Sequence, residues 1–146
     1  MLRLLSAVVL VAFLVTPAAA QNLDAIKARK EALKAMADAA KLPGEMLKGD
    51  APFDLGPVKA ALARYQEKAA KLPELFPDDA KTGGDTEALA VIWEKKDDFV
   101  ERFKKLVAEA KSAEGKITDE FSFQEEFPKV MGNCSACHKI YRKPKE

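Results

Sequence analysis

The sequence predicts an all-α fold, an antiparallel four-helix bundle, from three observations. Beyond residue 20 the chain is rich in Ala, Lys, Glu and Leu and poor in β-branched residues, a composition that favours helices. Apolar residues recur every three or four positions in four segments. Pro and Gly gather between these segments, as is typical of turns. Amphipathic helices joined by connections of uneven length indicate a bundle whose apolar faces meet in one core.

The first twenty residues have the pattern of a secretory signal peptide. Arg3 is their only charge, residues 4–15 are almost all apolar, and the segment ends in Ala18-Ala19-Ala20, an A-x-A cleavage pattern. We therefore expect residues 1–20 to be removed after Ala20 and residues 21–146 to form one exported domain. The apolar run is too short to span a membrane, and no other such run occurs.

The charge balance gives no indication of binding to nucleic acid or to an anionic membrane. The full chain has 24 Lys and Arg against 23 Asp and Glu, and loss of Arg3 would make it neutral. Only the tail, Lys139–Lys145, is locally basic. It fits either a helix end that complements the helix dipole or a docking patch for an acidic partner.

The first half of the domain contains two predicted helices. One covers Leu23–Ala40 or beyond; Leu42-Pro43-Gly44 kinks or interrupts it, and residues 45–47 are able to continue it. After a loop over residues 48–54, the other runs from about Pro57 to Lys71, because Pro is suited to the first turn of a helix. Their apolar faces contain Ile26, Leu33, Met36 and Ala40 in the first, and Val58, Leu62, Tyr65 and Ala69 in the second.

The second half contains the two longer predicted helices. A crossover over residues 72–85, with three turn-forming Pro and Gly clusters, separates them from the first pair. The third helix is expected over Glu87–Ala113, and the fourth from Thr118 or Asp119 as N-cap to about Arg142. Pro128 either bends the fourth helix or marks the start of its regular part. Their apolar faces contain Ile92, Phe99, Phe103, Leu106 and Ala110 in the third, and Phe127, Met131, Cys134, His138 and Tyr141 in the fourth.

The run Cys134-Ser135-Ala136-Cys137-His138 lies near the end of the fourth predicted helix. Residues three and four apart on a helix share a face, so Cys134, Cys137 and His138 are expected on one side. A C-x-x-C-H run is typical of c-type haem attachment, in which the sulfurs bind the vinyl groups and the imidazole binds the iron. The sequence thus predicts a bundle with one covalent haem c, held by Cys134 and Cys137, with His138 as metal ligand.

Three other interpretations of the cysteines compete with haem attachment. A redox dithiol usually lies at a helix N-terminus in a βαβ context, and no strand-like run precedes this motif. A closed zinc site needs four ligands, whereas the chain has two Cys and one His. A plain structural disulfide is the third interpretation.

Arg29 interrupts the apolar face of the first predicted helix, between Ile26 and Leu33. A buried unpaired guanidinium is costly, so Arg29 is expected either to reach the surface along its stem or to pair with an anion inside the bundle. A haem propionate is one such anion. A local carboxylate, Glu31 or Asp38, is the alternative partner.

Because the chain has one histidine, the sixth position of the iron is left to Met, Lys, water or no ligand. Met36, Met46 and Met131 are the available thioethers. Met131 shares the face of the attachment helix and is expected in the core. Met36 and Met46 could serve only if the haem lay further along the first segment.

The chain resembles cytochrome c′, the class II c-type cytochromes, over essentially all of residues 21–146. The resemblance rests on the C-terminal position of the C-x-x-C-H motif, on an Arg-bearing first helix, and on the turns at Leu72-Pro73 and Leu75-Phe76-Pro77. It implies a periplasmic four-helix haem protein in which Arg29 contacts a haem propionate. It also implies that Leu33 covers the distal face of the haem and that Arg142 lies near the proximal face.

The resemblance also implies a function. Members with an apolar residue at the position of Leu33 have five-coordinate, high-spin iron, whereas low-spin members carry Met there. The expected function is therefore binding of NO or CO at an open iron site, with electron transfer to an unidentified redox partner and no enzymatic activity. A low-spin, Met-ligated electron carrier is the alternative. Members are often homodimers, and the sequence leaves monomer and dimer open.

Overall fold

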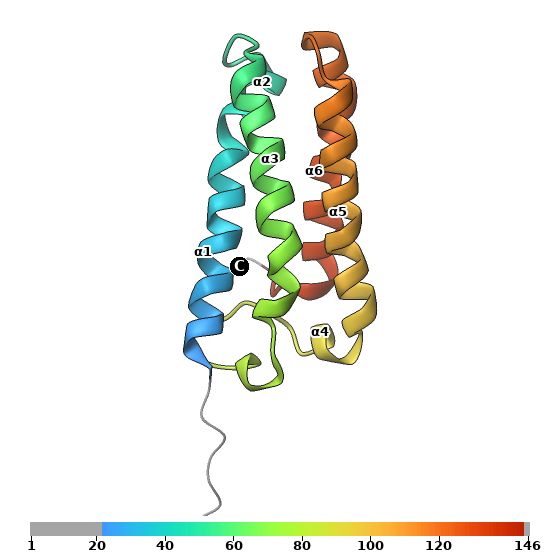
Figure 1. Ribbon diagram of the computed structural model, residues 1–146. Coiled ribbons are helices and arrows are strands. Elements are labelled where there is room, and N and C mark those ends of the chain that lie inside the picture. The colour runs from blue at the N-terminus through green and yellow to red at the C-terminus, as the bar shows by residue number, and fades with distance from the viewer. Residues whose placement is uncertain (1–21, 145–146) are drawn as a thin grey trace, which may run out of the picture.

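The computed structural model of the chain describes residues 22–144, and the predicted signal peptide, residues 1–20, lies outside them. Four long helices run side by side with alternating direction (Figure 1). They are α1 (Leu23–Ala39), α3 (Leu55–Lys71), α5 (Lys96–Lys116) and α6 (Glu120–Tyr141). The predicted all-α class and the antiparallel four-helix bundle are therefore confirmed.

The first predicted helix is divided in two, as expected from Pro43. The structure has α1 up to Ala39 and then a short helix α2 (Lys41–Lys48), with the break at Ala40. Pro43 has no N–H to donate to the carbonyl four residues earlier, that of Ala39, and its ring crowds that carbonyl. The interruption therefore falls before the proline, and the residues after it are helical again.

Helix α3 begins two residues earlier than predicted because Asp54 caps it. The Asp54 carboxylate accepts a hydrogen bond from the Gly56 N–H at 2.8 Å, which satisfies one of the free donors at the helix start. Gly49 ends α2 in the left-handed conformation, with φ of 79°, so the chain can turn back tightly toward α3.

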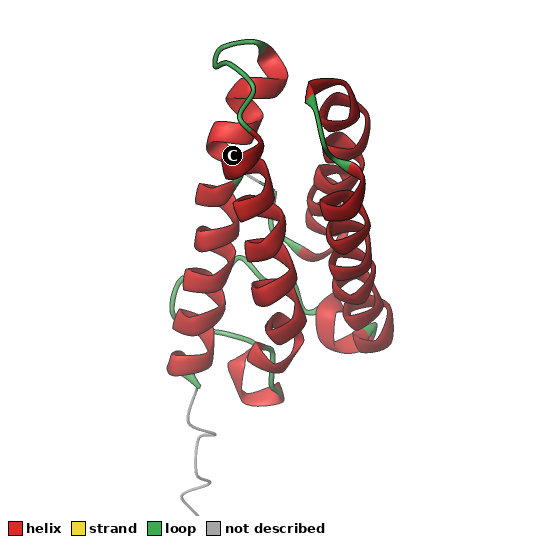
Figure 2. Ribbon diagram, turned by 45° about the horizontal axis from the view of Figure 1, so that its top comes forward, coloured by secondary structure: helices red, strands yellow, loops and turns green. Residues whose placement is uncertain are grey.

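The connection from α3 to α5 is built from short helical turns and loops at one end of the bundle (Figure 2). It contains η1 (Leu72–Leu75), η2 (Asp78–Ala80) and α4 (Val91–Glu94). The predicted third helix, Glu87–Ala113, is wrong at its start, because residues 87–90 are not helical and Lys95 separates α4 from α5. From Lys96 onward the prediction is confirmed, and α5 ends at Lys116.

Backbone pairing with the end of α6 explains why residues 87–90 are not helical. The N–H of Leu89 donates to the Tyr141 carbonyl at 3.0 Å, and the N–H of Lys143 donates to the Glu87 carbonyl at 2.8 Å. Ala88 and Arg142 form an isolated antiparallel bridge between these bonds. A helix over residues 87–90 would direct these groups to its own chain, so the pairing with α6 replaces it.

Helix α6 begins at the N-cap Asp119, as predicted, and is continuous to Tyr141. Asp119 accepts a hydrogen bond from the Ser122 N–H at 2.8 Å, and the Ser122 hydroxyl accepts from the Asp119 N–H at 3.1 Å, which is a capping box. Pro128 lies inside the helix, so the regular part does not start there. Its side chain is exposed, where water can solvate the carbonyl it leaves unbonded.

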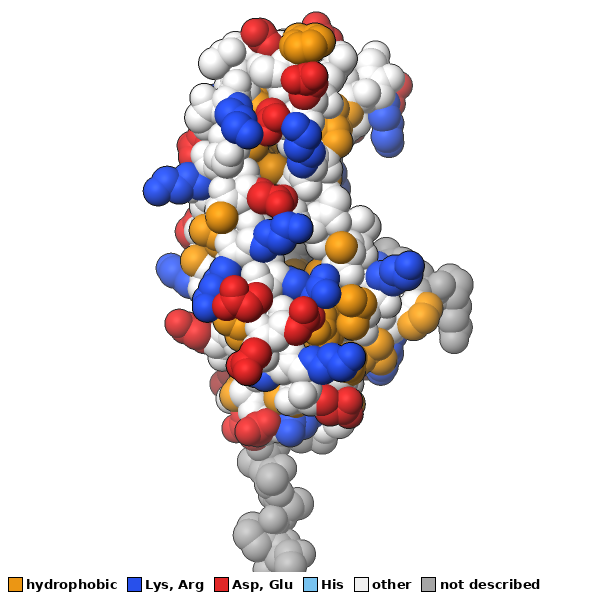
Figure 3. All heavy atoms as spheres, turned by 90° about the vertical axis from the view of Figure 1, so that its right-hand side faces the viewer, with side chains coloured by type: hydrophobic (Ala, Val, Ile, Leu, Met, Phe, Trp, Pro, Cys, Tyr) orange, Lys and Arg blue, Asp and Glu red, His pale blue; other side chains and the backbone are white. Residues whose placement is uncertain are grey.

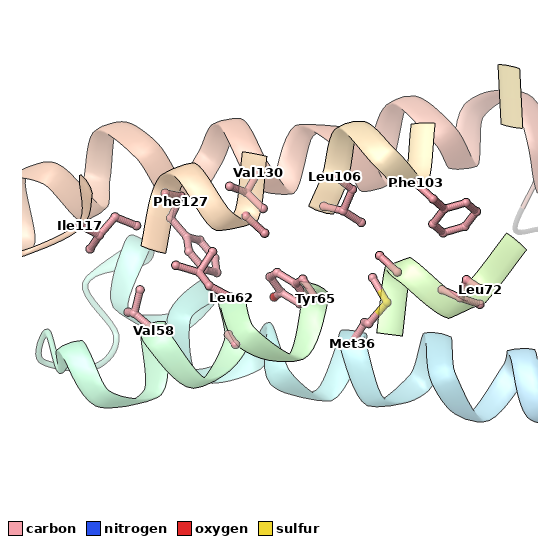
Figure 4. Close-up of a cluster of buried hydrophobic side chains, with 14 of the residues drawn as sticks. Met36, Val58, Leu62, Tyr65, Leu72, Phe103, Leu106, Ile117, Phe127 and Val130 are labelled. Carbon is pink, nitrogen blue, oxygen red and sulfur yellow. The ribbon is translucent and has the colours of Figure 1, made fainter. Parts of the chain in front are cut away.

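The core fills the bundle where α3 faces α5 and α6. Val58 and Leu62 of α3 point toward Ile117 and toward Phe127 of α6, and all four are 0% exposed (Figure 4). Helix α3 packs against both α1 and α5, and α6 packs against α5. Helices α1 and α6, by contrast, make little direct contact with each other. Within residues 22–144 no helix has the length and apolar content needed to cross a membrane.

Candidate functional site

A cavity of about 850 Å³ lies between α1 and α6, two long helices that make little direct contact with each other. Its walls come from α1, α3, α5 and α6 and from the loop around Thr86. The volume is in the range that holds a cofactor or small-molecule ligand. All six residues singled out in the sequence line this cavity: Arg29, Leu33, Cys134, Cys137, His138 and Arg142.

Helix α6 presents both sulfurs and the imidazole to the cavity. Cys134, Cys137 and His138 are each partly buried, and the two thiols are free rather than joined in a disulfide. Burial raises the pKa of Cys134 and raises that of Cys137 to about 11. A redox dithiol requires the opposite shift, since its thiolate is the reactive form. The raised pKa values therefore disfavour thiol exchange at this pair.

Arg29 is 2% exposed and is bound by the crossover rather than by a carboxylate. Its guanidinium donates to the carbonyl of Ala80 at 2.9 Å, to that of Leu75 at 3.4 Å and to the Thr86 hydroxyl at 2.7 Å. It also lies 4.5 Å from the centre of the Phe76 ring. The predicted alternative, a salt bridge to Glu31 or Asp38, is wrong.

The two candidate carboxylates, Glu31 and Asp38, do not pair with Arg29. Asp38 pairs with Lys34 at 2.5 Å and with Lys41 at 2.7 Å on the exposed side of α1. The hydrogen bonds of Arg29 use three of the five N–H groups of a guanidinium. Two N–H groups are left for an anion in the cavity, while burial lowers the pKa of Arg29. An anion there would offset the cost of this buried charge.

Leu33 lines the cavity from α1, whereas His138 lines it from α6. The three methionines considered as iron ligands differ in their position relative to the cavity. Met36 and Met131 line the cavity, but Met46 is buried in the core away from its wall. The sulfur of Met131 accepts a hydrogen bond from the Tyr65 hydroxyl at 3.6 Å. Met36 is therefore the thioether that α1 offers to this space.

The charges on the cavity wall favour an anionic ligand. The cationic side chains on the wall are Arg29, Lys30, Lys34, Arg102 and Arg142. The carboxylates there are only Asp85 and Glu87. In addition, the Nε atom of Arg142 is buried without a hydrogen-bond partner, since the nearest carboxylate oxygen, of Glu87, is 3.9 Å away. A haem fits this wall because its two carboxylates match the surplus of cations, while its ring matches the apolar lining.

Two parts of the wall were not predicted from the sequence. Arg102 lies on α5 between Phe99 and Phe103, so it interrupts an apolar face as Arg29 does, and the same signal could have found it. Thr86 lies in a loop and gave no periodic signal. The described residues also contain no group of three or more His, Cys, Asp or Glu placed to hold a metal ion by themselves.

These features define a class of protein. Two free thiols and an imidazole on one helix face a large, mostly apolar and cation-rich cavity in a four-helix bundle, which is the site of a c-type haem protein. The sequence profile described as Cytochrome C' matches residues 24–142 of the chain. The chain belongs to the cytochrome c′ family, and its cofactor is covalently bound haem c.

Individual relatives agree with this assignment. The chain is 48% identical over 122 residues to a cytochrome c' of Rhodopseudomonas palustris, covering 84% of each protein. It is 32% identical over 120 residues to a cytochrome c-556 of Agrobacterium tumefaciens, covering 82% of this chain and 94% of that protein.

Solved structures show the same fold. A cytochrome c' structure from Rhodopseudomonas palustris superposes with a TM-score of 0.83 at 47% identity, covering 84% of this chain and 98% of that one. A nitric oxide complex of a variant of cytochrome c prime from Alcaligenes xylosoxidans superposes with a TM-score of 0.73 at 25% identity, covering 86% and 98%.

Proposed function

We propose that this chain is exported to the periplasm and binds NO or CO at a five-coordinate, high-spin haem. Cys134 and Cys137 tether the haem, and His138 is the protein ligand to its iron. When bound, the haem supplies an iron that accepts a small ligand or an electron. The observation that carries the proposal is Leu33, because the side chain that α1 directs into the cavity at this position has no lone pair to offer.

The apolar part of the cavity wall favours small uncharged ligands at the iron. Leu33 shares this wall with the buried side chains Phe76, Ile92 and Phe99. His138 is the sole histidine of the chain, so no second imidazole can act as an acid or base. The wall therefore supports binding rather than turnover, which makes a non-enzymatic gas-binding and electron-transfer role the best-supported function.

The cationic residues hold the acidic edge of the haem. Arg29 has two N–H groups left for a propionate, and Arg142 has a buried Nε without a hydrogen-bond partner. Both side chains lie on the cavity wall, Arg29 from α1 and Arg142 at the end of α6. The nitric oxide complex of the structural neighbour supports NO as a ligand for this fold.

A low-spin electron carrier is the second candidate. The observation that favours it is Met36, a thioether on the cavity wall three residues beyond Leu33. The relatives of this chain also include a protein named cytochrome c-556, in addition to those named cytochrome c'. If the Met36 sulfur bound the iron, six-coordination would leave little to rearrange during electron transfer.

Spectra of three variants decide between the two candidates. The purified wild type is expected to show a high-spin spectrum that changes on addition of NO or CO. Leu33→Met is expected to shift it toward low spin, because it places a sulfur where α1 faces the cavity. Met36→Leu is expected to leave the wild-type high-spin spectrum unchanged.

Leu47→Met is the matched control, since Leu47 is a partly buried leucine of α2 that does not line the cavity. Exchange of Leu for Met is well tolerated in cores, so all three variants should fold. A low-spin wild type that becomes high-spin in Met36→Leu would overturn the proposal in favour of the second candidate.

A further inference from the structure

A charged cluster joins α5 to the last turn of α6 at the cavity wall. It consists of Asp98, Arg102 and Tyr141. The Asp98 carboxylate accepts hydrogen bonds from the Tyr141 hydroxyl and from the Nε of Arg102, the latter at 2.7 Å. The Arg102 guanidinium also lies 5.7 Å from the centre of the Tyr141 ring. Arg102 and Tyr141 line the cavity, whereas Asp98 stands behind them.

The sequence places the cluster at this point. Asp98 and Arg102 are four residues apart on α5, so their side chains meet on one face of the helix. Tyr141 is the last residue of α6, one turn beyond His138, and its ring packs edge-on against Phe99 with centroids 5.1 Å apart. The cluster therefore holds the part of α6 that carries the predicted iron ligand.

The two charges of the cluster have opposite signs and lie at the cavity that the proposed function assigns to the haem. Arg102 and Tyr141 line the same cavity as Cys137 and His138. Asp98 is hydrogen-bonded to both Arg102 and Tyr141 from outside the cavity lining. The face that α5 and α6 present to solvent carries acidic and basic side chains interspersed, with no broad patch of one sign (Figure 3). Removing one charge of the Asp98–Arg102 pair therefore changes the local potential against a surface of mixed sign.

We propose that Asp98 is a positioning residue that holds Arg102 at the cavity wall and offsets its charge, and that this pair tunes the reduction potential of the bound haem. The inference rests on the proposed attachment through Cys134 and Cys137. The oxidised haem carries one more positive charge than the reduced haem. A cation left alone on the wall disfavours oxidation, and an anion left alone favours it.

The proposal predicts shifts of the reduction potential of opposite sign for the two single variants. Asp98→Asn leaves Arg102 uncompensated and raises the reduction potential. Arg102→Gln leaves Asp98 uncompensated and lowers it. The double variant removes both charges and returns the potential close to that of the wild type. A purely structural role predicts something else, since either variant would loosen the end of α6, admit water to the haem and shift the potential in the same direction.

The experiment is a potentiometric titration of the purified holoprotein in low salt. We expect each single variant to change the oxidation equilibrium constant by about three- to tenfold in opposite directions. A tenfold change corresponds to about 59 mV for one electron. Asp97→Asn is the matched control, since it removes the same charge from the neighbouring, likewise exposed position of α5, whereas Asp98 is the carboxylate bonded to Arg102 and Tyr141. Its shift should be clearly smaller than that of Asp98→Asn.

Several results would overturn the inference. Shifts of the same sign in Asp98→Asn and Arg102→Gln would assign the cluster a structural role. An Asp97→Asn shift as large as that of Asp98→Asn would show a general surface effect. If Asp98→Asn does not fold, Arg102→Gln alone must still lower the potential. Failure of the proposed attachment shows up separately, because haem would then be lost from the denatured wild type before any titration.

Discussion

The two ends of the bundle use the same helices in different ways. At the end near Ile117, inward side chains such as Leu62 and Phe127 are fully buried and fill the space between α3, α5 and α6. At the other end the inward residues of α1 and α6 line a cavity of about 850 Å³ instead. We call these the closed end and the open end. Helical periodicity marks inward positions at both ends, but it does not show whether they meet another side chain or a ligand.

Residue chemistry separates the two ends where periodicity does not. Inward positions of the closed end are aliphatic or aromatic, as a packed core requires. Inward positions of the open end include Arg29, Cys134, His138 and Arg102. Burying charged or polar side chains in a core without partners costs free energy. Polar groups on an otherwise apolar helix face therefore indicate the ligand-binding end of a bundle.

The largest expected effect is at the sulfurs of the open end. Replacing both cysteines, as Cys134→Ala with Cys137→Ala, should abolish covalent haem retention completely, because no other thiol is present in the chain. Haem staining of the denatured protein after electrophoresis measures this. Ser135→Ala, at the exposed position between them, should keep the stain. Haem that persists in the double variant would contradict the assignment of the attachment site.

The second-largest expected effect is seen when one leucine from each end is replaced and the changes in stability and ligand binding are compared. Leu62→Ala should destabilise the holoprotein by about 2–5 kcal/mol, because it leaves a cavity in a filled core, and should leave the haem spectrum unchanged. Leu33→Ala should cost clearly less, since Leu33 is only partly buried. It should instead change the rates of NO and CO binding.

Denaturant unfolding and ligand-binding kinetics on the two variants provide the test. The comparison fails if Leu33→Ala destabilises the protein as much as Leu62→Ala, or if Leu62→Ala alters ligand binding as much as Leu33→Ala.

The smallest expected effect is a change in the pH dependence of stability, caused by the cap at the start of α6 on the closed end. Hydrogen bonds from the Ser122 N–H and hydroxyl hold the pKa of Asp119 below its ordinary value of about 3.8. A lowered folded-state pKa stabilises the protein above the unfolded-state value, and this stabilisation is lost as the pH falls through the folded-state value. Asp119→Asn keeps a capping oxygen but does not titrate, so the fall in stability below about pH 4 should be shallower.

Denaturant midpoints between pH 2 and pH 7, with Glu120→Gln as a variant that removes a neighbouring non-capping carboxylate, measure this effect. An unchanged pH dependence in Asp119→Asn would show that the cap does not contribute.

Much of the fold could be predicted because it depends on local pattern. The spacing of apolar residues located all four helices, and Asp119 and Pro43 located a start and a break. The non-helical conformation of residues 87–90 could not be predicted, since these residues are held by backbone pairing with the end of α6, about fifty residues further along the chain. Such pairing leaves no periodic signal in either segment.

The candidate site, like the fold, could be predicted from the sequence only in part. Cys134, Cys137 and His138 follow from a motif, and Arg29 from a charge on an apolar face. The alternative carboxylate partner of Arg29 was wrong, because its partners within the protein are a threonine hydroxyl and carbonyls from the crossover. Backbone carbonyls have no sequence signature. Arg102 carried the same signal as Arg29, although its spacing of four residues from Asp98 is also that of an ordinary surface ion pair.

The account depends most on an open coordination position beside Leu33 at the open end of the bundle. An electron paramagnetic resonance spectrum of the oxidised, purified holoprotein reports this directly. A high-spin signal that disappears when NO is added is the result expected here. A low-spin signal in the ligand-free protein would show a sixth ligand already bound and would contradict the account.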